Sequence, residues 1–315
     1  MNKQKLIGRY AVVSSLALLT ACGGGGGGGG GSGVRAEPTL SLDSSGYAGK
    51  TIEISSSTNV NYVNQLSADI NGAFGLLEDL HESLWDQNGG VSGTTNCDGG
   101  GTATVTYAGK DWNIDERWSF NDCVVSTFSH GDVLLNGTFR YVDTLTGETA
   151  TSESWKGYES YNITGELKNS GEPLTVKGRS DWDQLFRWEN ETASGRFVDT
   201  IEAFELKVGT HYIALTNTET RLEGTESDLE YSMTGKLIGS AIQGHVQVST
   251  PTPVSLSVNE ACPTRGIIRV ASDGSAEVRY GSSAAGTAGA VAVWIDGQIV
   301  ESHADCNSVG FVPIL

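Results

Sequence analysis

The sequence predicts a mainly β protein: a strongly curved antiparallel sheet, forming an open or partly closed barrel, with one N-terminal amphipathic helix packed on it. From about residue 101 onwards, apolar and polar residues alternate, as in the run from Val254 to Val258. This alternation is typical of antiparallel strands with one buried and one solvated face. Near residues 60–85, apolar residues instead recur at steps of three and four, which indicates a helix. A β-sandwich is the alternative architecture.

The helical segment has one apolar stripe, and Gly89-Gly90 ends the region. A glycine pair is unfavourable for continuing a helix, so we expect the helix to stop there. The stripe consists of Val60, Val63, Leu66, Ile70, Phe74, Leu77, Leu80 and Leu84.

Glycines recur inside the strand-like runs, and glycine within a strand often marks a bulge or a bend. Bends on neighbouring strands curl a sheet, which is the basis for the predicted curvature. These glycines are Gly137, Gly165, Gly178, Gly195, Gly224, Gly235 and Gly244. Asp273-Gly274 and Asp296-Gly297 predict tight hairpin turns, since glycine accepts a positive φ.

The first residues have the features of an export signal. Lys3, Lys5 and Arg9 precede a short apolar run that ends at Leu19, and this run is shorter than the ~20 residues that span a bilayer. The following Leu19-Thr20-Ala21-Cys22 resembles the lipobox of bacterial lipoproteins. The resemblance implies that residues 1–21 are removed and that Cys22 carries the lipid that anchors the protein to a membrane. In enteric bacteria, an aspartate directly after the lipidated cysteine resembles a signal to stay in the inner membrane. Gly23 occupies this position, which favours anchoring to the outer membrane, on its periplasmic or its exterior face.

A glycine-rich tether follows the lipidated cysteine over residues 22–49, with an unbroken glycine run from Gly23 to Gly31. Glycine-rich segments form flexible coils, so we expect the tether to hold the domain clear of the lipid headgroups. Residues 50–315 then form a single β-rich domain with the helix near 60–85. A small C-terminal piece beginning near Thr250-Pro251 is the alternative division.

Four cysteines remain besides Cys22, and an even number in an oxidising compartment predicts disulfides. We favour Cys97–Cys123 and Cys262–Cys306 because each pair brackets one local run of strands, although the other two pairings stay open. A zinc site is the alternative, but there is no C-x₂-C spacing to support it.

The formal net charge is −18 at pH 7, and removal of residues 1–21 makes the chain three units more negative. This acidity argues against nucleic acid as a partner and against docking on anionic lipid. The five histidines are scattered, and there is no nucleophile elbow, H-E-x-x-H, phosphate loop or dinucleotide fingerprint. We therefore expect no catalytic residues, no metal and no cofactor.

One cluster places acids beside tryptophans: Asp181, Trp182, Asp183 and Trp188. Glycan-binding sites combine such residues, and glycosidases need two carboxylates at a fixed separation. The competing interpretation is polar strand ends beside half-buried tryptophans, which suit a pleated surface.

Short motifs around Cys97-Asp98-Gly99, Phe120 to Cys123 and Cys262-Pro263-Thr264 are similar to poorly characterised proteobacterial lipoproteins. This resemblance implies a fold and a location in the cell envelope but no activity. The leading hypothesis is a membrane-anchored cell-envelope lipoprotein with a non-enzymatic structural or interaction role and an envelope protein as a partner. The alternatives are a carrier of an acyl chain or other apolar ligand in the curved sheet, and a surface glycan-binding protein. A curved sheet with an inner helix is loosely similar in shape to lipoprotein carriers of acyl chains, but shape alone does not establish function.

Overall fold

The computed structural model describes residues 37–88, 91–110, 113–189, 192–225, 227–257, 262–284 and 291–304. It contains one long helix, α2 (Ser57–Asn88), a short 3-10 helix, η1 (Tyr47–Gly49), and one large sheet. The strands are β1 (Glu53–Ile54), β2 (Gly93–Asn96), β3 (Thr102–Lys110), β4 (Asn113–Thr127), β5 (Gly131–Glu148), β6 (Ser152–Leu167), β7 (Glu172–Glu189), β8 (Thr192–Val208), β9 (His211–Thr225), β10 (Asp228–Gly239), β11 (Gly244–Ser257), β12 (Arg265–Gly281), β13 (Val291–Ile295) and β14 (Gln298–His303).

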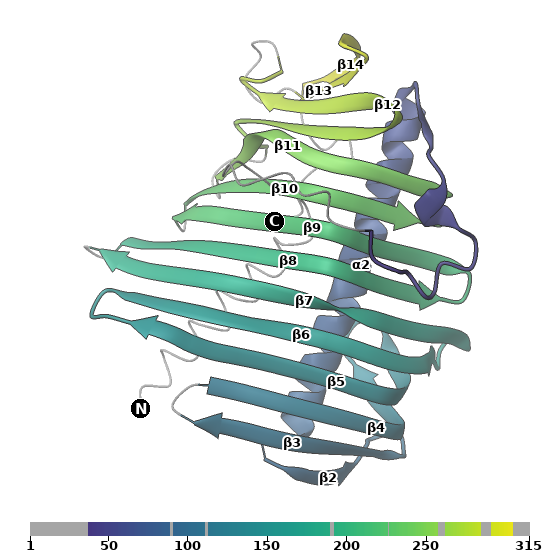
Figure 1. Ribbon diagram of the computed structural model, residues 1–315, viewed down its shortest axis with the longest axis vertical. Coiled ribbons are helices and arrows are strands. Elements are labelled where there is room, and N and C mark those ends of the chain that lie inside the picture. Colours follow the sequence, from purple (N-terminus) through teal and green to yellow (C-terminus); the bar gives the residue numbers. More distant parts are fainter. Residues whose placement is uncertain are drawn as a thin grey trace.

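The sheet is an antiparallel meander in which each strand from β2 to β14 pairs with its neighbours in sequence (Figure 1). The short β1 lies off this path and pairs with β12 in parallel. The predicted mainly β class with one helix is therefore confirmed. Within the described ranges the sheet is open: β2 and β14 lie at its opposite ends, and no second sheet faces it. Each hairpin places the next strand beside the previous one, so the described strands form an open meander. This arrangement is neither a closed barrel nor a sandwich.

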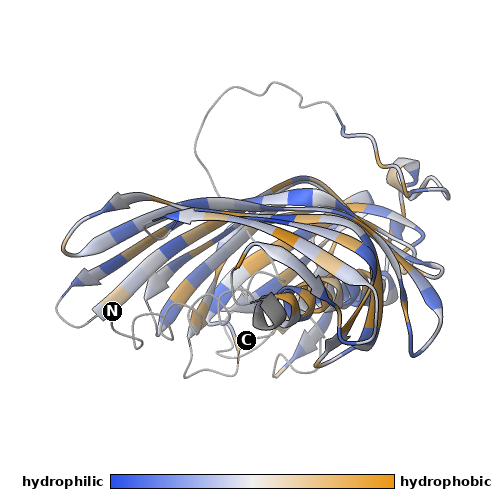
Figure 2. Ribbon diagram, turned by 90° about the horizontal axis from the view of Figure 1, so that it is seen from below, coloured by the Kyte–Doolittle hydropathy of each residue, from blue (hydrophilic) through white to orange (hydrophobic). Residues whose placement is uncertain are grey.

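Several of the in-strand glycines coincide with breaks in the strand register. Gly178 has φ 134° and lies at the shift between β7 and β8, and Gly235 has φ 153° at the shift between β10 and β9. Only glycine adopts such angles readily, and an extra residue at a bulge bends the strand. Figure 2 shows the strands bending so that α2 lies on the inner side of the sheet.

The two predicted turns have different outcomes. Asp296 and Gly297 both have positive φ and join β13 to β14, as predicted. Asp273 and Gly274 instead lie within β12, so the hairpin predicted there is wrong. At this point β12 changes its antiparallel neighbour from β11 to β13, and β1 pairs with it through Ile54 and Gly274.

Helix α2 occupies the position that the apolar stripe predicts. It begins after Ser56, whose hydroxyl accepts the Asn59 backbone N–H at 3.4 Å, while the Asn59 side chain accepts the Ser56 N–H at 3.1 Å. This reciprocal arrangement satisfies donors that a helix start leaves free. The helix crosses the strands on the inner face of the sheet.

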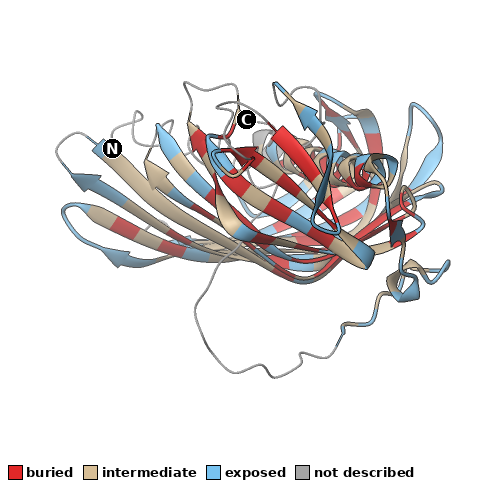
Figure 3. Cartoon of the chain, turned by 90° about the horizontal axis from the view of Figure 1, so that it is seen from above, coloured by how far each residue is buried: buried red, intermediate tan, exposed pale blue. Residues whose placement is uncertain are grey.

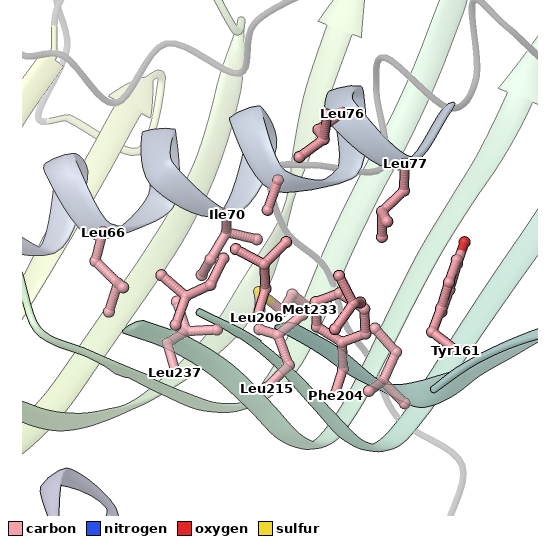
Figure 4. Packing of buried hydrophobic residues seen from close by; sticks show 14 of the residues in the cluster. Leu66, Ile70, Leu76, Leu77, Tyr161, Phe204, Leu206, Leu215, Met233 and Leu237 are labelled. Carbon is pink, nitrogen blue, oxygen red and sulfur yellow. The ribbon is translucent and has the colours of Figure 1, made fainter. Parts of the chain in front are cut away.

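The main hydrophobic core lies between α2 and the inner face of the sheet. Leu66, Ile70 and Leu77 project from the helix toward the sheet (Figure 4) and are buried. Gly239 gives Leu66 the room to do so, because a Cβ there would lie 2.3 Å from the Leu66 Cδ1. Full burial of one such side chain contributes about 1.5–3 kcal/mol, so this stripe fixes the helix on the sheet.

Residues 37–48 lie against the opposite, outer face of the sheet (Figure 3). The buried Glu205 of β8 accepts the backbone N–H groups of Ser41 and Leu42 at 2.8 and 2.7 Å, and the Tyr212 hydroxyl at 3.0 Å. Leu42 and Tyr47 pack with Tyr212 in a small second cluster. We call residues 37–48 the outer strap; it holds the N-terminal end of the described chain on the face opposite α2.

The predicted Cys97–Cys123 disulfide is present, with its Cα atoms 5.4 Å apart. Cys262 is also disulfide-bonded. Cys306, its expected counterpart, and the expected lipidation site Cys22 lie outside the described residues, so both of those expectations stay predictions.

Candidate functional site

The four residues of the predicted glycan cluster do not form one site. Trp182 lies on the inner face of β7, whereas the side chains of Asp181 and Asp183 project from the outer face, because successive strand residues point to opposite sides. There Asp181 pairs with Arg179 at 2.5 Å and Asp183 with Lys156 at 2.9 Å. Trp188 lies near the end of β7 and is 44% exposed.

A different set of acids lies on the inner face, in a repeated acid-x-aromatic pattern. The Trp118 Nε1 donates to the Glu116 Oε2 at 3.2 Å, and the Trp155 Nε1 donates to the Glu153 Oε2 at 3.4 Å. In the same way the Tyr161 hydroxyl donates to Glu159. Residues two apart share one face of a strand, so each aromatic residue supplies one donor to its buried or half-buried carboxylate.

Strand pairing places several of these polar side chains side by side across the sheet. Glu116 lies opposite Tyr141, Tyr141 opposite Glu159, and Glu159 opposite Ser180. The Ser180 hydroxyl donates to Asp199 on β8. We call Glu116, Tyr141, Glu159, Ser180 and Asp199 the inner polar row; it runs from β4 to β8.

Helix α2 contributes His81 to this row. The His81 Nε2 lies 3.6 Å from the Glu116 Oε2, and its Nδ1 lies 3.9 Å from the Glu159 Oε1. Its ring also packs on Phe139 and Tyr141, with centroids 5.2 and 4.9 Å apart. His81 therefore joins β4 and β6 through two carboxylates, and its side chain stays 24% exposed.

Trp182 extends the row with an aromatic surface. Its ring centroid lies 5.4 Å from that of Tyr141, and its Nε1 donates to the Asp143 Oδ1 at 3.4 Å. The ring covers Gly157 on β6, where a Cβ would lie 2.5 Å from the indole. Glycine at position 157 therefore allows the indole to lie flat on the neighbouring strand.

The carboxyl groups in and beside the row affect one another. Burial, with the nearby charge of Glu159, raises the pKa of Asp199 to about 7, against the lowering effect of the Ser180 hydroxyl. Burial also raises the pKa of Glu78 on α2, helped by Glu82, Asp79 and Glu159. The pKa of Tyr161 is raised by burial and by Glu159. The inner face is therefore a region of crowded negative charge.

The basic side chains of the central strands point away from this region. By strand alternation, the lysines and arginines of β4–β9 project from the outer face. Several of them pair with acids there, as Arg140 does with Asp115 at 2.9 Å. These residues are Arg117, Arg140, Lys156, Lys177, Arg179, Arg187, Arg196, Lys207 and Arg221. The inner face of the same strands carries Glu116, Asp143, Glu153, Glu159 and Asp199.

This arrangement can accept hydrogen bonds and positive charge and can stack against flat or apolar ligand surfaces. Within the part of the chain that the structure describes, no group of three or more His, Cys, Asp and Glu side chains is placed to hold a metal ion. Over the same residues, no helix has the length and apolarity to cross a bilayer.

Sequence reasoning singled out Trp182 but missed Glu78, His81, Glu116, Glu159 and Asp199. The acid-x-aromatic spacing of Glu116 with Trp118, Glu153 with Trp155 and Glu159 with Tyr161 was a signal that could have indicated three of the inner carboxylates. Comparison with protein-family models, with curated proteins and with solved structures gives no match to this chain.

Proposed function

We propose that this chain is a membrane-anchored cell-envelope lipoprotein with a non-enzymatic binding role, and that it binds its ligand at the inner polar row. One observation carries the second part. Acids and aromatic rings gather on one face beside α2, with Glu159 25% exposed, while the basic residues of the same strands lie on the other face. A structural face would pair its acids with those bases, as the outer face does.

The anchoring part rests on Leu19-Thr20-Ala21-Cys22 and is tested by metabolic labelling with an alkyne fatty acid. The wild-type chain should take up label and sediment with the outer-membrane fraction. Cys22→Ala should take up none and should be recovered in the soluble periplasmic fraction. Equal labelling of both chains would contradict lipidation at this cysteine.

The binding part is tested by native mass spectrometry of the chain purified gently from its own envelope. We expect a small-molecule adduct that is lost on denaturation and is reduced in Trp182→Ala. Lys156→Ala is the matched control, because Lys156 lies on the outer face of the neighbouring strand β6. An adduct that is equally weakened by both changes would contradict binding at the inner face.

A glycan is a second candidate ligand, favoured by the pair of Trp182 and Tyr141 rings 5.4 Å apart beside Asp143. Aromatic rings can cover the apolar face of a sugar while carboxylates accept its hydroxyl groups. A glycan array should then give a signal that Trp182→Ala abolishes and Trp188→Ala leaves unchanged. An array signal that survives Trp182→Ala would exclude this candidate.

The expected apolar carrier has less support. Leu66, Ile70 and Leu77 of α2 pack against the apolar part of the inner face, so an acyl chain could enter only if the helix left the sheet. For the proposed binding at the inner face, we also propose the strong, barrel-like curvature expected from the in-strand glycines. A sheet curved in this way would surround a ligand on more than one side.

A further inference from the structure

We propose that the inner polar row binds a linear polyamine, with one ammonium group held by Glu159 between Glu78 and Asp199 and against the rings of Tyr141 and Trp182. This inference rests on the proposed binding function and names the chemical class of its ligand. It goes beyond a general binding role because the carboxylates of the row favour a cationic ligand over a neutral or an anionic one.

Glu159 has aromatic and acidic neighbours on the inner face. It lies opposite Tyr141 on one side and opposite Ser180 on the other, and Ser180 donates to Asp199. Opposed residues on one sheet face have Cβ atoms about 5 Å apart. The carboxylates of Glu159 and Asp199 therefore flank a single serine, with aromatic rings on neighbouring positions, which is a suitable environment for an ammonium group.

Glu116, at the β4 end of the row, has a buried acceptor atom that the described residues do not satisfy. The side chain of Glu116 is 1% exposed, and its Oε2 accepts the Trp118 Nε1–H. Its Oε1 has no hydrogen-bond partner among the described residues. Leaving a buried carboxylate oxygen without a partner is costly, so this end of the row lacks one hydrogen-bond donor among the described residues.

The carboxylates of Glu159, Asp199 and Glu78 disfavour one another's ionised forms. The charge of Glu159 raises the pKa values of both Asp199 and Glu78, in addition to the effect of burial. His81, at 3.9 Å from Glu159, is a cationic candidate that offsets part of this repulsion when it is protonated. An ammonium group between the carboxylates would relieve the repulsion further, whereas a phosphate or an acidic glycan would increase it.

The length of the row favours an elongated ligand. Glu116, Glu159 and Asp199 lie on β4, β6 and β8, so the row crosses four strand spacings, or about 19 Å at ~4.8 Å each. These carboxylates recur on alternate strands, with Tyr141 between the first two and Ser180 between the last two. Such a spacing matches a flexible chain with several separated ammonium groups better than one compact cation.

The test is isothermal titration calorimetry of the exported, purified full chain with spermidine at pH 7 and low salt. We expect saturable 1:1 binding that Glu159→Gln weakens at least tenfold. Asp181→Asn is the matched control, because Asp181 is an acid on the outer face of the adjacent strand, and it should leave the affinity unchanged. Circular dichroism and urea unfolding of each variant establish that it is folded.

Binding should also release protons, because a bound cation favours the ionised form of Asp199. With a pKa of about 7, Asp199 is about half protonated at pH 7, so titrations in buffers of different ionisation enthalpy should show release of about half a proton. Asp199→Asn should abolish this release. Spermidine binding with no proton release in the wild-type chain would contradict the assigned position of the ammonium group.

Several outcomes overturn the inference. Absence of saturable spermidine binding would do so, and so would equal weakening by Glu159→Gln and Asp181→Asn, which indicates a general surface-charge effect. Tighter binding of a basic peptide than of spermidine would replace the polyamine with a peptide ligand. If a neutral glycan binds in a Trp182-dependent way while spermidine does not, the polyamine inference fails and the proposed binding function stands.

Discussion

The Nε2 of His81 on α2 lies 3.6 Å from the Oε2 of Glu116 on β4, and the Glu116 side chain is 1% exposed. This contact and the approach of His81 to Glu159 are polar interactions between the helix and the sheet, beside the apolar core. Replacement by His81→Gln removes the imidazole beside a buried carboxylate, so we expect a loss of about 1–3 kcal/mol in the free energy of unfolding. Urea unfolding measures it.

The pair can be separated from its surroundings by a double-mutant cycle. Glu116→Gln keeps the size of the side chain and removes its charge, so the loss caused by His81→Gln should be smaller in that background. An equal loss in both backgrounds would show that His81 contributes through its other contacts, with Glu159, Phe139 and Tyr141, and not through the charge of Glu116.

Asp199 should make stability depend on pH. Its pKa in the folded chain is about 7, above the ~3.9 of an unfolded aspartate, so the folded state binds more protons between these values. The contribution of Asp199 to the free energy of unfolding therefore falls as pH rises from about 4 to 7 and stays lower above 7.

Asp199→Asn should remove that dependence, since the amide oxygen still accepts the Ser180 hydroxyl without a charge. We expect the variant to be more stable than the wild-type chain by on the order of 1–2 kcal/mol at pH 8, since solvent screening reduces the ~4 kcal/mol that three pKa units represent. Near pH 4 the two should be similar. A variant that is less stable at pH 8 would contradict the assignment.

The Cys97–Cys123 disulfide should contribute to stability by restricting the unfolded chain. Its cysteines are 26 residues apart, and a loop of this length corresponds to a loss of about 3–4 kcal/mol when the bond is removed. Guanidinium unfolding of the Cys97→Ala, Cys123→Ala double variant measures the loss. An unchanged midpoint would show that the bond adds nothing beyond the sheet pairing of β3 and β4.

The outer strap should depend on one carboxylate. Glu205→Gln keeps one acceptor oxygen but loses the charge that binds the N–H groups of Ser41 and Leu42. We expect faster cleavage within residues 37–48 in limited proteolysis, with little change in the rest of the domain. Glu219→Gln, at an exposed position on β9, is the control and should cleave at the wild-type rate.

The elements that depend on local sequence were predictable. The stripe from Val60 to Leu84 predicted α2, and the period-two runs predicted the strands, because both patterns come from backbone geometry alone. The Asp296-Gly297 turn followed for the same reason. Asp273-Gly274 has similar chemistry but lies inside β12, where pairing with β1 and the change of neighbouring strand determine the structure. Such long-range pairing leaves no local signal.

The candidate site was harder to predict. The adjacency of Asp181, Trp182 and Asp183 suggested one cluster, but neighbours in a strand point to opposite faces. The period-two pairing of Glu159 with Tyr161 was available in the sequence. The approach of His81 to Glu116 and Glu159 was not, because it depends on where α2 crosses the sheet.

Zero-length crosslinking of spermidine to the chain with a carbodiimide, followed by peptide mass spectrometry, tests directly whether a polyamine binds at the inner polar row. A carbodiimide activates an accessible carboxylate, and a bound amine couples to the carboxylate beside it faster than free amine does. Attachment that an excess of unreactive tetraalkylated polyamine suppresses therefore marks the binding site. We expect competitor-sensitive spermidine attachment on Glu159, Glu78 or Asp199. Competitor-sensitive attachment mainly to Asp181 and Asp183 on the outer face, or none at any acid, would contradict a ligand site on the inner polar row.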